Sequence, residues 1–306
     1  MTLALVSCNG RQGRQYRDSF PIVDVPSVIM EPEERAVYAQ AHYWEEFFAL
    51  DGPTDTAAVL GVPTEKVEQA LADFVRLSAG IDLEEAQAGV LGLFSALERK
   101  QSEDTASKCY RVMCDLVSKY LYDPNSPVRD EDLYLPFVRA AAVSGYTSED
   151  MRPAYEYETR MCELNRRGMF VPEFKIRKAD GTQTSLYAIK AGYTLLCFNN
   201  PDCADCKTVQ DQIQSRSYIS ARIASGDLAV VSVYIDEDVR TWRKHVKAYP
   251  DNWVVGYDPK MVIRTDELYN VRAIPSLYLL DREKKVVLKD APVERVLQYL
   301  DNLFGE

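Results

Sequence analysis

One pair of cysteines constrains this chain more than any other feature. Cys203 and Cys206 form its only C-x-x-C sequence, and they follow a nearly continuous apolar run, Tyr193–Phe198, which predicts a buried strand. Asn199–Asp202 breaks that strand, and a helix is expected from about Cys203 to about Ala224. The sequence therefore places a dithiol where a buried strand passes into a helix.

This position favours thiol chemistry. The first-turn N–H groups of a helix have no intrahelical acceptor and the helix dipole is positive there, so a thiolate at Cys203 is stabilised. Thiolate is the nucleophile of disulfide exchange. Cys206 is within one turn, where it can close a disulfide with Cys203 and expel a partner held as a mixed disulfide. The alternatives are a structural disulfide or two inert core thiols.

The segments around the dithiol predict a mixed sheet with helices on both faces. Val171–Ile176 alternates as a strand before the hairpin turn Asp180-Gly181, and Leu228–Ile235 is a second buried strand. The remaining expected elements are a helix over about Val239–Lys247, a short helix near Met261–Tyr269, a hairpin of Leu277–Leu280 with Lys285–Leu288, and a final helix from Pro292 to about Leu300. An α/β domain over residues 168–306 follows from this order.

A proline marks the start of one of these strands. Pro275 stands just before the apolar run Leu277–Leu280, and a proline cannot donate a hydrogen bond to a β ladder. The position is tolerated if the Ile274–Pro275 bond turns the chain sharply, as a cis peptide does. We therefore expect a cis bond here.

The order of elements, the C-x-x-C pair and the Ile-Pro sequence together resemble the thioredoxin superfamily, most closely its bacterial TlpA-type branch with an extra N-terminal hairpin. The resemblance covers residues 168–306. It implies that Cys203 is the exposed attacking thiol and Cys206 the recessed resolving thiol. It further implies that Pro275 is a cis-proline facing the dithiol and that the backbone of Ile274 pairs with an extended substrate segment.

The residues around the dithiol depart from that family. Asp202 stands where the family usually has tryptophan, and Asp205 where it often has proline. Both carboxylates oppose thiolate formation by like-charge repulsion, and Lys207 compensates in part. Because a strong oxidant depends on a stabilised reduced form, these charges indicate a reducing poise. Cys197 lies in the strand where thioredoxin has a buried carboxylate, so proton transfer is expected to use water or Asp205.

Other chemistries fit less well. A peroxiredoxin has threonine three residues before its reacting cysteine, where this chain has Asn200. The sequence has no G-x-S-x-G motif and no Gly-rich phosphate loop before a helix. A second pair of metal ligands is missing, since His42 and His245 are the only histidines, so no metal is expected. His245, on a charged helix, is expected to be an exposed surface residue.

Residues 28–167 predict an all-helical domain. Six helical segments are expected, and in the first, second and fourth of them apolar residues recur at spacings of three and four. These segments lie at about 32–52, 63–77, 82–100, 109–120, 132–143 and 148–167, with Asp82 as the cap of the third. Cys109, Cys114 and Cys162 are expected in its core. The aromatic run His42–Phe48 fits a core stripe better than a ligand face, and no polar groups converge as catalysis requires.

Two runs of this domain carry a further resemblance. His42–Phe48 and Lys119–Pro127 resemble a helical domain of unassigned function that occurs ahead of thioredoxin-like modules in Bacteroidota envelope proteins. The resemblance says which domains accompany this one and leaves its role open, as a scaffold or a recognition module.

The charge of the chain divides near Gly168. Residues 168–306 carry 19 acidic and 19 basic side chains, so the net charge of −11 belongs wholly to residues 1–167. This asymmetry suggests a domain boundary near Gly168. An acidic protein repels phosphate backbones, so no nucleic-acid partner is expected. No uncharged apolar run approaches 18 residues, so no membrane-spanning helix is expected.

The first residues carry a separate signal. Leu5–Cys8 resembles the lipobox of bacterial lipoproteins. The resemblance implies that the Cys8 thiol is diacylated and that the acyl chains tether the protein to a membrane. Each buried methylene of these chains contributes ~0.8 kcal/mol to membrane binding. A signal peptide has a basic region and about 7–15 apolar residues. The stretch before Cys8 is shorter, so we expect the true start upstream and interpret residues 1–27 as a signal remnant and tether. The alternative is a frayed cytosolic terminus with a chance cysteine.

These observations predict a thiol-disulfide oxidoreductase of the bacterial cell envelope, a lipoprotein facing the periplasm. Its partners would be protein disulfides or thiols and an upstream electron donor. No small cofactor is needed, because the two sulfurs carry the electrons. The alternative is an envelope binding or assembly lipoprotein, in which the acidic helical half contacts a partner and the thioredoxin-like half is a redox-inactive scaffold.

Overall fold

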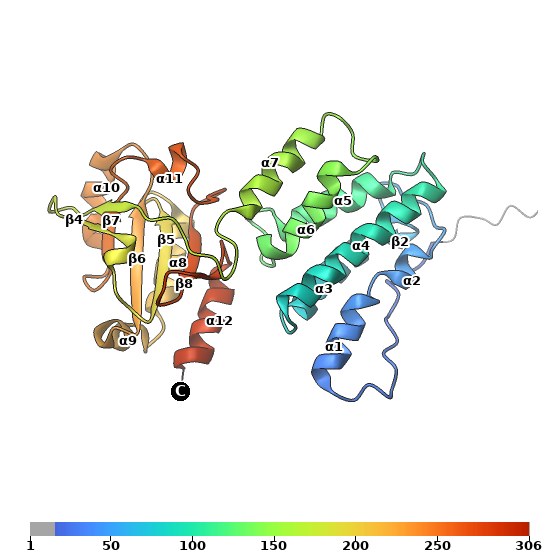
Figure 1. Ribbon diagram of the computed structural model, residues 1–306, viewed down its shortest axis with the longest axis horizontal. Helices are drawn as coiled ribbons and strands as arrows, with labels where there is room; N and C mark the ends of the chain where they lie inside the picture. Colours follow the sequence, from blue (N-terminus) through green and yellow to red (C-terminus); the bar gives the residue numbers. More distant parts are fainter. Residues whose placement is uncertain (1–15, 306) are drawn as a thin grey trace, which may run out of the picture. The chain divides into compact units, whose positions relative to one another are not determined.

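The computed structural model describes residues 16–305, and their packing divides them into two compact units (Figure 1). The first unit contains the chain up to Tyr120 together with residues 144–148. The second contains residues 121–143 and the chain from Glu149 onward. None of the helices described in residues 16–305 combines the length and apolar character that crossing a bilayer requires.

The first unit is built almost entirely from helices. Its elements are α1 (Pro32–Ala41), α2 (Glu45–Phe48), α3 (Thr64–Ser78), α4 (Leu83–Glu103), α5 (Cys109–Leu121, whose last residue belongs to the second unit) and a short hairpin of β1 (Ala58–Val59) and β2 (Val62–Pro63). Asp82 caps α4 as predicted, since its carboxylate accepts the N–H of Glu84 at 2.8 Å. The hairpin was not predicted. Its two-residue turn, Leu60-Gly61, has positive φ at both positions, which suits the twist of paired strands.

The aromatic run of the first unit is core, as predicted. One long helix was expected over 32–52, but the chain turns at His42–Trp44 between α1 and α2. After this turn Trp44, Phe47 and Phe48 are buried, and the Trp44 ring lies edge-on to Phe74 of α3 at 5.7 Å between centroids. Cys109 and Cys114 are buried free thiols of this unit.

The second unit contains a seven-stranded mixed sheet. Its strands are β3 (Lys175–Arg177), β4 (Gln183–Ser185), β5 (Tyr193–Asn199), β6 (Leu228–Tyr234), β7 (Val254–Tyr257), β8 (Ser276–Leu280) and β9 (Val286–Leu288), in the spatial order β4-β3-β7-β6-β5-β8-β9. β5, β6 and β7 are parallel, and β8 runs antiparallel to β5. β5 is thus an inner strand with a hydrogen-bonded neighbour on each side.

Seven α-helices belong to the described part of this unit. They are α6 (Glu131–Val143), α7 (Arg152–Glu163), α8 (Ala204–Gln214), α9 (Ile219–Ser225), α10 (Val239–His245), α11 (Val262–Thr265) and α12 (Val293–Phe304), with short 3₁₀ turns at Leu186–Ala188 and Val246–Ala248. The single helix expected over 203–224 is two helices. The break places Arg216 Nε 3.0 Å from the Asp301 carboxylate of α12, a distant partner that local periodicity does not reveal.

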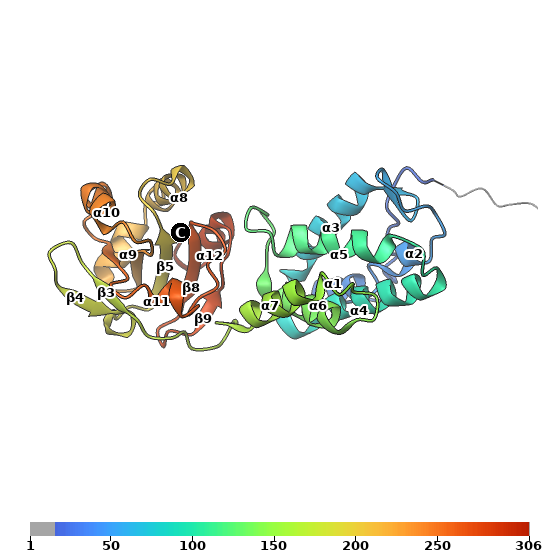
Figure 2. The ribbon, with the colours of Figure 1, turned by 90° about the horizontal axis from the view of Figure 1, so that it is seen from above.

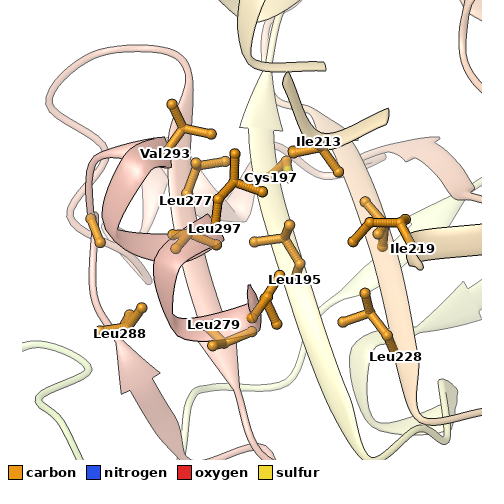
Figure 3. Packing of buried hydrophobic residues seen from close by; sticks show 14 of the residues in the cluster. Leu195, Cys197, Ile213, Ile219, Leu228, Leu277, Leu279, Leu288, Val293 and Leu297 are labelled. Carbon is orange, nitrogen blue, oxygen red and sulfur yellow. The ribbon is translucent and has the colours of Figure 1, made fainter. Parts of the chain in front are cut away.

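The residues of β5 alternate between the two faces of the sheet. Leu195 and Cys197 point to the face covered by α8, α9 and α12 (Figures 2 and 3), while Leu196 and Phe198 point to the opposite face. The first cluster includes Ile213 of α8 and the buried face of α12. α8 is therefore fixed on the sheet by its apolar side, and its N-terminus stays at the end of β5.

Candidate active site

The turn between β5 and α8 places Cys203 at the start of the helix. The carbonyl oxygen of Asn200 accepts the N–H of Cys203 at 3.1 Å, and the Asn200 side chain accepts the N–H of Asp202 at 3.0 Å. Cys203 is the N-cap residue of α8, with φ −94° and ψ 118°. Its Sγ accepts the N–H of Cys206 at 3.2 Å, so the sulfur satisfies one of the first-turn donors. This arrangement points a backbone N–H of the first helical turn at the Cys203 sulfur.

The two thiols differ in exposure. Cys203 is half-buried, whereas only 8% of Cys206 is exposed. Burial raises the pKa of the Cys206 thiol well above its ordinary value, and the neighbouring Cys203 and Asp205 raise it further. An incoming molecule therefore meets Cys203 first, and Cys206 stays protonated behind it.

The Ile-Pro segment lies against the first thiol. The Ile274–Pro275 peptide is cis, and the carbonyl oxygen of Ile274 is 3.7 Å from Cys203 Sγ. In the antiparallel pairing of β8 with β5, Ser276 lies opposite Phe198. The Ile274–Pro275 peptide therefore lies at the end of β5 that leads into α8. Cys203, Cys206 and the Ile274–Pro275 peptide, chosen from the sequence as site residues, are thus brought together.

The charged residues near the dithiol are exposed. Asp202 Oδ1 is 3.5 Å from Nε2 of His245, whose side chain is 47% exposed. His245 is exposed, as expected, and it also faces Asp202 and lines the cavity behind Cys206. Lys207 pairs with Asp211 one turn along α8, so its ammonium group is already engaged by another carboxylate. Asp205 is exposed in the first turn of α8.

A cavity of about 60 Å³ lies behind the dithiol. Its polar lining includes Asn199 and Tyr249, which sequence reasoning missed, and its lining residues in the described structure include no carboxylate. The Tyr249 hydroxyl donates to Asn199 Oδ1 at 2.7 Å, and Asn199 Nδ2 donates to Ser232 Oγ at 2.6 Å. Burial raises the pKa of Tyr249 to about 12, so its hydroxyl is a neutral donor. Asn199 follows an apolar run and Tyr249 precedes a proline, so neither stands in a pattern that indicates a site.

The third thiol of this region is inert. Cys197 is buried on the α8 side of β5, and burial alone raises its pKa to about 12. In residues 16–305, no three His, Cys, Asp or Glu side chains are grouped as a metal site. Cys8, which the sequence predicts to be lipidated, lies outside the described residues.

Comparison with known proteins agrees with this architecture. A domain of unknown function, DUF5106, matches residues 4–161, and the AhpC/TSA family matches residues 168–289. A thioredoxin-like protein from Bacteroides caccae is 35% identical over 93% of this chain and 98% of that chain, and its crystal structure superposes with a TM-score of 0.78. These matches confirm the predicted fold class, a helical region followed by a thioredoxin-like domain.

Shorter solved structures match less than half of this chain. The C-terminal domain of an uncharacterized protein from Bacteroides fragilis is 40% identical over 44% of this chain and 97% of that chain, with a TM-score of 0.43. A thiol:disulfide interchange protein from Bacteroides sp. is 20% identical over 46% of this chain and 91% of that chain, with a TM-score of 0.40. No curated protein matches the chain.

The difference between the two thiols is testable by alkylation. At pH 8, iodoacetamide should modify Cys203 in the Cys206→Ser variant at least about tenfold faster than Cys206 in the Cys203→Ser variant, because burial shields Cys206 and raises its pKa. Peptide mass spectrometry measures both rates. Cys197 should stay unmodified in both variants as an internal control. Equal rates for the two thiols would contradict the assignment of Cys206 as the recessed group.

Proposed function

Because the chain belongs to the thioredoxin-like proteins in which a DUF5106 domain precedes an AhpC/TSA domain, we propose that it is a thiol-disulfide oxidoreductase acting on protein disulfides or thiols. One observation carries the proposal. The Cys203 sulfur is accessible at the N-terminus of α8, accepts the Cys206 N–H, and lies 3.7 Å from the Ile274 carbonyl oxygen.

The proposed reaction has two exchange steps. The Cys203 thiolate attacks a substrate disulfide, forms a mixed disulfide, and releases the first substrate sulfur as a thiolate that is protonated by solvent. The Cys206 thiol then loses its proton and attacks Cys203 Sγ, which breaks the mixed disulfide and releases the second substrate thiol. The substrate gains two electrons and the protein is left with a Cys203–Cys206 disulfide. A donor dithiol must reduce that disulfide before the next cycle.

The Ile274 carbonyl group orients the substrate for the first exchange step. An extended substrate segment can donate a backbone N–H to such a carbonyl, as peptides do when they add to an exposed strand edge. Because this oxygen lies beside Cys203 Sγ, a segment held there presents its cysteine to the attacking thiol. The cis-proline segment is therefore the substrate-binding element of the proposal.

The second step needs a base, because burial holds Cys206 in its protonated form. Asn199 and Tyr249 are hydrogen-bonded to each other and are neutral, so neither accepts this proton. We assign the role to a water molecule in the cavity or to the carboxylate of Asp205, which adjoins Cys206 in sequence. Among the described residues that line the cavity, none is an aspartate or a glutamate.

We also propose that the pair has a reducing poise. Asp202 and Asp205 are exposed carboxylates beside the dithiol and oppose thiolate formation, while Lys207 is occupied by Asp211. A less stable thiolate means a less stable reduced form, hence a more negative reduction potential.

Removing one of these charges should change the potential in a known direction. Asp205→Asn should make the reduction potential less negative by about 5–20 mV, since 30 mV corresponds to ~1.4 kcal/mol and exposed charges contribute less than ~1 kcal/mol. Titration against glutathione or dithiothreitol buffers measures it. Asp227→Asn, at the opposite end of β5, is the matched control and should leave the potential unchanged. A wild-type potential near the −120 mV typical of a strong oxidant would reject the reducing poise.

Catalysis itself is tested with insulin and dithiothreitol. The wild-type protein should accelerate reduction of the insulin disulfides, followed by turbidity, and Cys203→Ser should reduce the rate to that of dithiothreitol alone because the attacking sulfur is gone. Cys197→Ser, which changes a buried thiol outside the exchange steps, should keep most of the activity. If Cys203→Ser matches the wild type, the alternative of a binding protein with a redox-inactive thioredoxin-like scaffold is favoured.

The same chemistry can identify the substrate. In Cys206→Ser the second step is blocked, so partners remain attached to Cys203 as mixed disulfides that dithiothreitol releases. Non-reducing gels of envelope extracts followed by mass spectrometry would identify them. The Cys203→Ser/Cys206→Ser double variant should trap none.

We further propose that the protein is a periplasm-facing lipoprotein anchored at Cys8, on the strength of the sequence Leu5–Cys8. Two acyl chains bury enough methylenes for stable membrane attachment. Expressed from its chromosomal gene in a Bacteroidota host, the wild type should partition into the detergent phase of a Triton X-114 extract, and Cys8→Ala into the aqueous phase. Cys203→Ser should partition as the wild type does. Recovery of the wild type in the aqueous phase would reject the anchor.

A further inference from the structure

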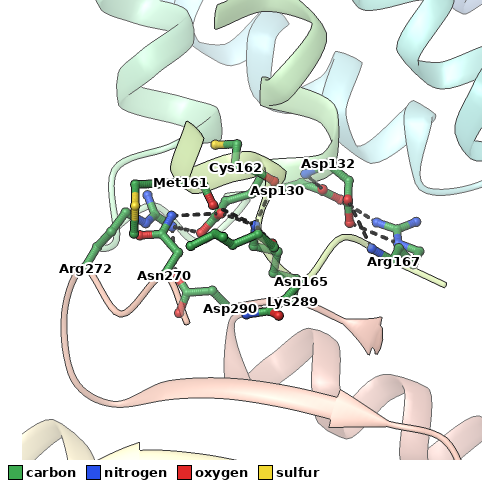
Figure 4. Close-up of polar contacts among 12 residues, drawn as sticks. Asp130, Asp132, Met161, Cys162, Asn165, Arg167, Asn270, Arg272, Lys289 and Asp290 are labelled. Carbon is green, nitrogen blue, oxygen red and sulfur yellow. Dashed lines mark hydrogen bonds and ion pairs between the residues drawn. The ribbon is translucent and has the colours of Figure 1, made fainter. Parts of the chain in front are cut away.

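A cluster of buried charges lies in the second unit (Figure 4). Its centre consists of Glu131 at the start of α6, Arg272 in the segment before Pro275, and Lys289 and Asp290 after β9. The side chains of Glu131, Lys289 and Asp290 are 1%, 1% and 3% exposed. Burying such charges is costly unless they are paired, so their mutual contacts hold these segments in one arrangement.

The two carboxylates bind the segment that carries the cis peptide at three points. Glu131 Oε2 accepts the side-chain N–H of Asn270 at 2.9 Å, and Glu131 Oε1 lies 3.2 Å from the guanidinium NH2 of Arg272. Asp290 Oδ2 accepts from that same nitrogen at 2.7 Å, and Asp290 Oδ1 accepts the hydroxyl hydrogen of Ser276 at 2.7 Å. Positions 270, 272 and 276 are thus all tied to Glu131 or Asp290, and Ile274 and Pro275 lie between the last two.

Arg272 is suited to join the two carboxylates. Its guanidinium plane lies over the ring of Tyr122, with Cζ 4.1 Å from the ring centroid, and its side chain is 10% exposed. Arginine combines such stacking with planar, fixed donors, whereas the lysine ammonium is a flexible point charge that does neither. Nε and NH1 of Arg272 have no hydrogen-bond partner among the described residues, so NH2 and the ring contact determine its position.

The far side of the cluster is fixed by α7. The ammonium group of Lys289 lies 2.8 Å from Glu131 Oε2 and donates to the carbonyl oxygens of Cys162 and Leu164 at 2.9 and 2.5 Å. A cation at the C-terminus of a helix is favourable because the last carbonyls lack partners there. α6 lies within the region that DUF5106 matches, and α7 begins within it. Both helices nevertheless pack in the same unit as the sheet.

We propose that the contact of Arg272 with Glu131 and Asp290 holds the Ile274–Pro275 peptide against Cys203, so that α6 takes part in forming the site that binds an extended substrate segment. The expected effect on the rate of disulfide reduction rests on the proposed function. The expected effect on the order of the 270–276 segment rests on the structure alone. Arg272, Glu131 and Asp290 are positioning residues, because they act through the 270–276 segment and touch neither sulfur.

The positioning consequence is measured by hydrogen exchange on the full chain. Arg272→Lys keeps the charge but cannot stack and join both carboxylates, so amides of the 270–277 segment should exchange at least about fivefold faster than in the wild type. Amides of β5 should not change. Ser276→Ala removes a single hydrogen bond to Asp290 and should give a smaller increase in the same segment. It also preserves the test if Arg272→Lys folds poorly.

Arg295→Gln is the matched control. Arg295 of α12 contacts Asp130 at 2.6 Å, beside Glu131, but makes no contact with the 270–276 segment among the interactions described. Arg167 remains paired with Asp130 in this variant. A charge that pairs with Asp130, next to the start of α6, is therefore removed without touching the proposed support, and exchange in the 270–277 segment should equal that of the wild type.

The kinetic consequence separates substrate positioning from general loss of stability. For insulin, Arg272→Lys should raise KM by about 5- to 50-fold because the segment that orients the peptide is displaced. Reduction of hydroxyethyl disulfide, which needs only an accessible Cys203, should stay within about twofold of the wild type. Arg295→Gln should leave both rates unchanged.

The outcomes are distinct. Unchanged exchange in Arg272→Lys and Ser276→Ala, or an equal increase in Arg295→Gln, would overturn the positioning role whatever the activity. An equal loss with insulin and hydroxyethyl disulfide would also overturn it, because the defect would then lie at the thiol. If the wild type reduces neither disulfide, the proposed oxidoreductase function fails, while the exchange data still decide the positioning role.

Discussion

Antiparallel pairing of β8 with the inner strand β5 is the interaction on which the site depends. Because Ser276 pairs with Phe198, the first residue of β8 lies next to the C-terminal end of β5. The turn after β5 places Cys203 at this same end of the strand, and Pro275 immediately precedes β8 there. Two segments 71 residues apart thus meet because β5 is hydrogen-bonded on both sides and buried on both faces. A shift of this register by one residue would turn every β8 side chain to the wrong face and remove the Ile274 carbonyl from Cys203.

The site combines a helix N-terminus that favours a thiolate with surroundings that oppose one. The Cys206 N–H and the first turn of α8 point at the Cys203 sulfur, and the proposed reducing poise sets them against the exposed carboxylates of Asp202 and Asp205. The cavity behind Cys206 adds neutral hydrogen-bonding groups, so burial dominates the pKa of that thiol. Desolvation is thus the main influence on the Cys206 thiol, and the effect of surface charge on Cys203 belongs to the proposed reducing poise.

Local patterns predicted the parts of this fold that local interactions determine. The β5 apolar run, the helix after it and the Asp82 cap each depend on neighbours a few residues away, and the periodicity of the sequence contains them. The break between α8 and α9 and the Glu131 cluster depend on partners far along the chain. Glu131 looks like an ordinary acidic residue in a first helical turn, because nothing near it indicates that Asn270, Arg272 and Lys289 will surround it. Tyr249 was missed for the same reason, since only the folded chain brings it to Asn199.

The buried charges also bear on how the two parts of the sequence are related. The charge distribution of the chain predicts a domain boundary near Gly168, and the two family models match residues 4–161 and 168–289. The packing joins α6 and α7 to the sheet, and the contacts at the start of α6 include ion pairs of Glu131 with Arg272 and Lys289 and of Asp130 with Arg295. Opposite charges that are buried together are costly to separate, because each would be left without a partner in a medium of low polarity. The acidic start of α6 is therefore matched to the cations of the thioredoxin-like segment, and the helical region extends physically into the unit that carries the dithiol.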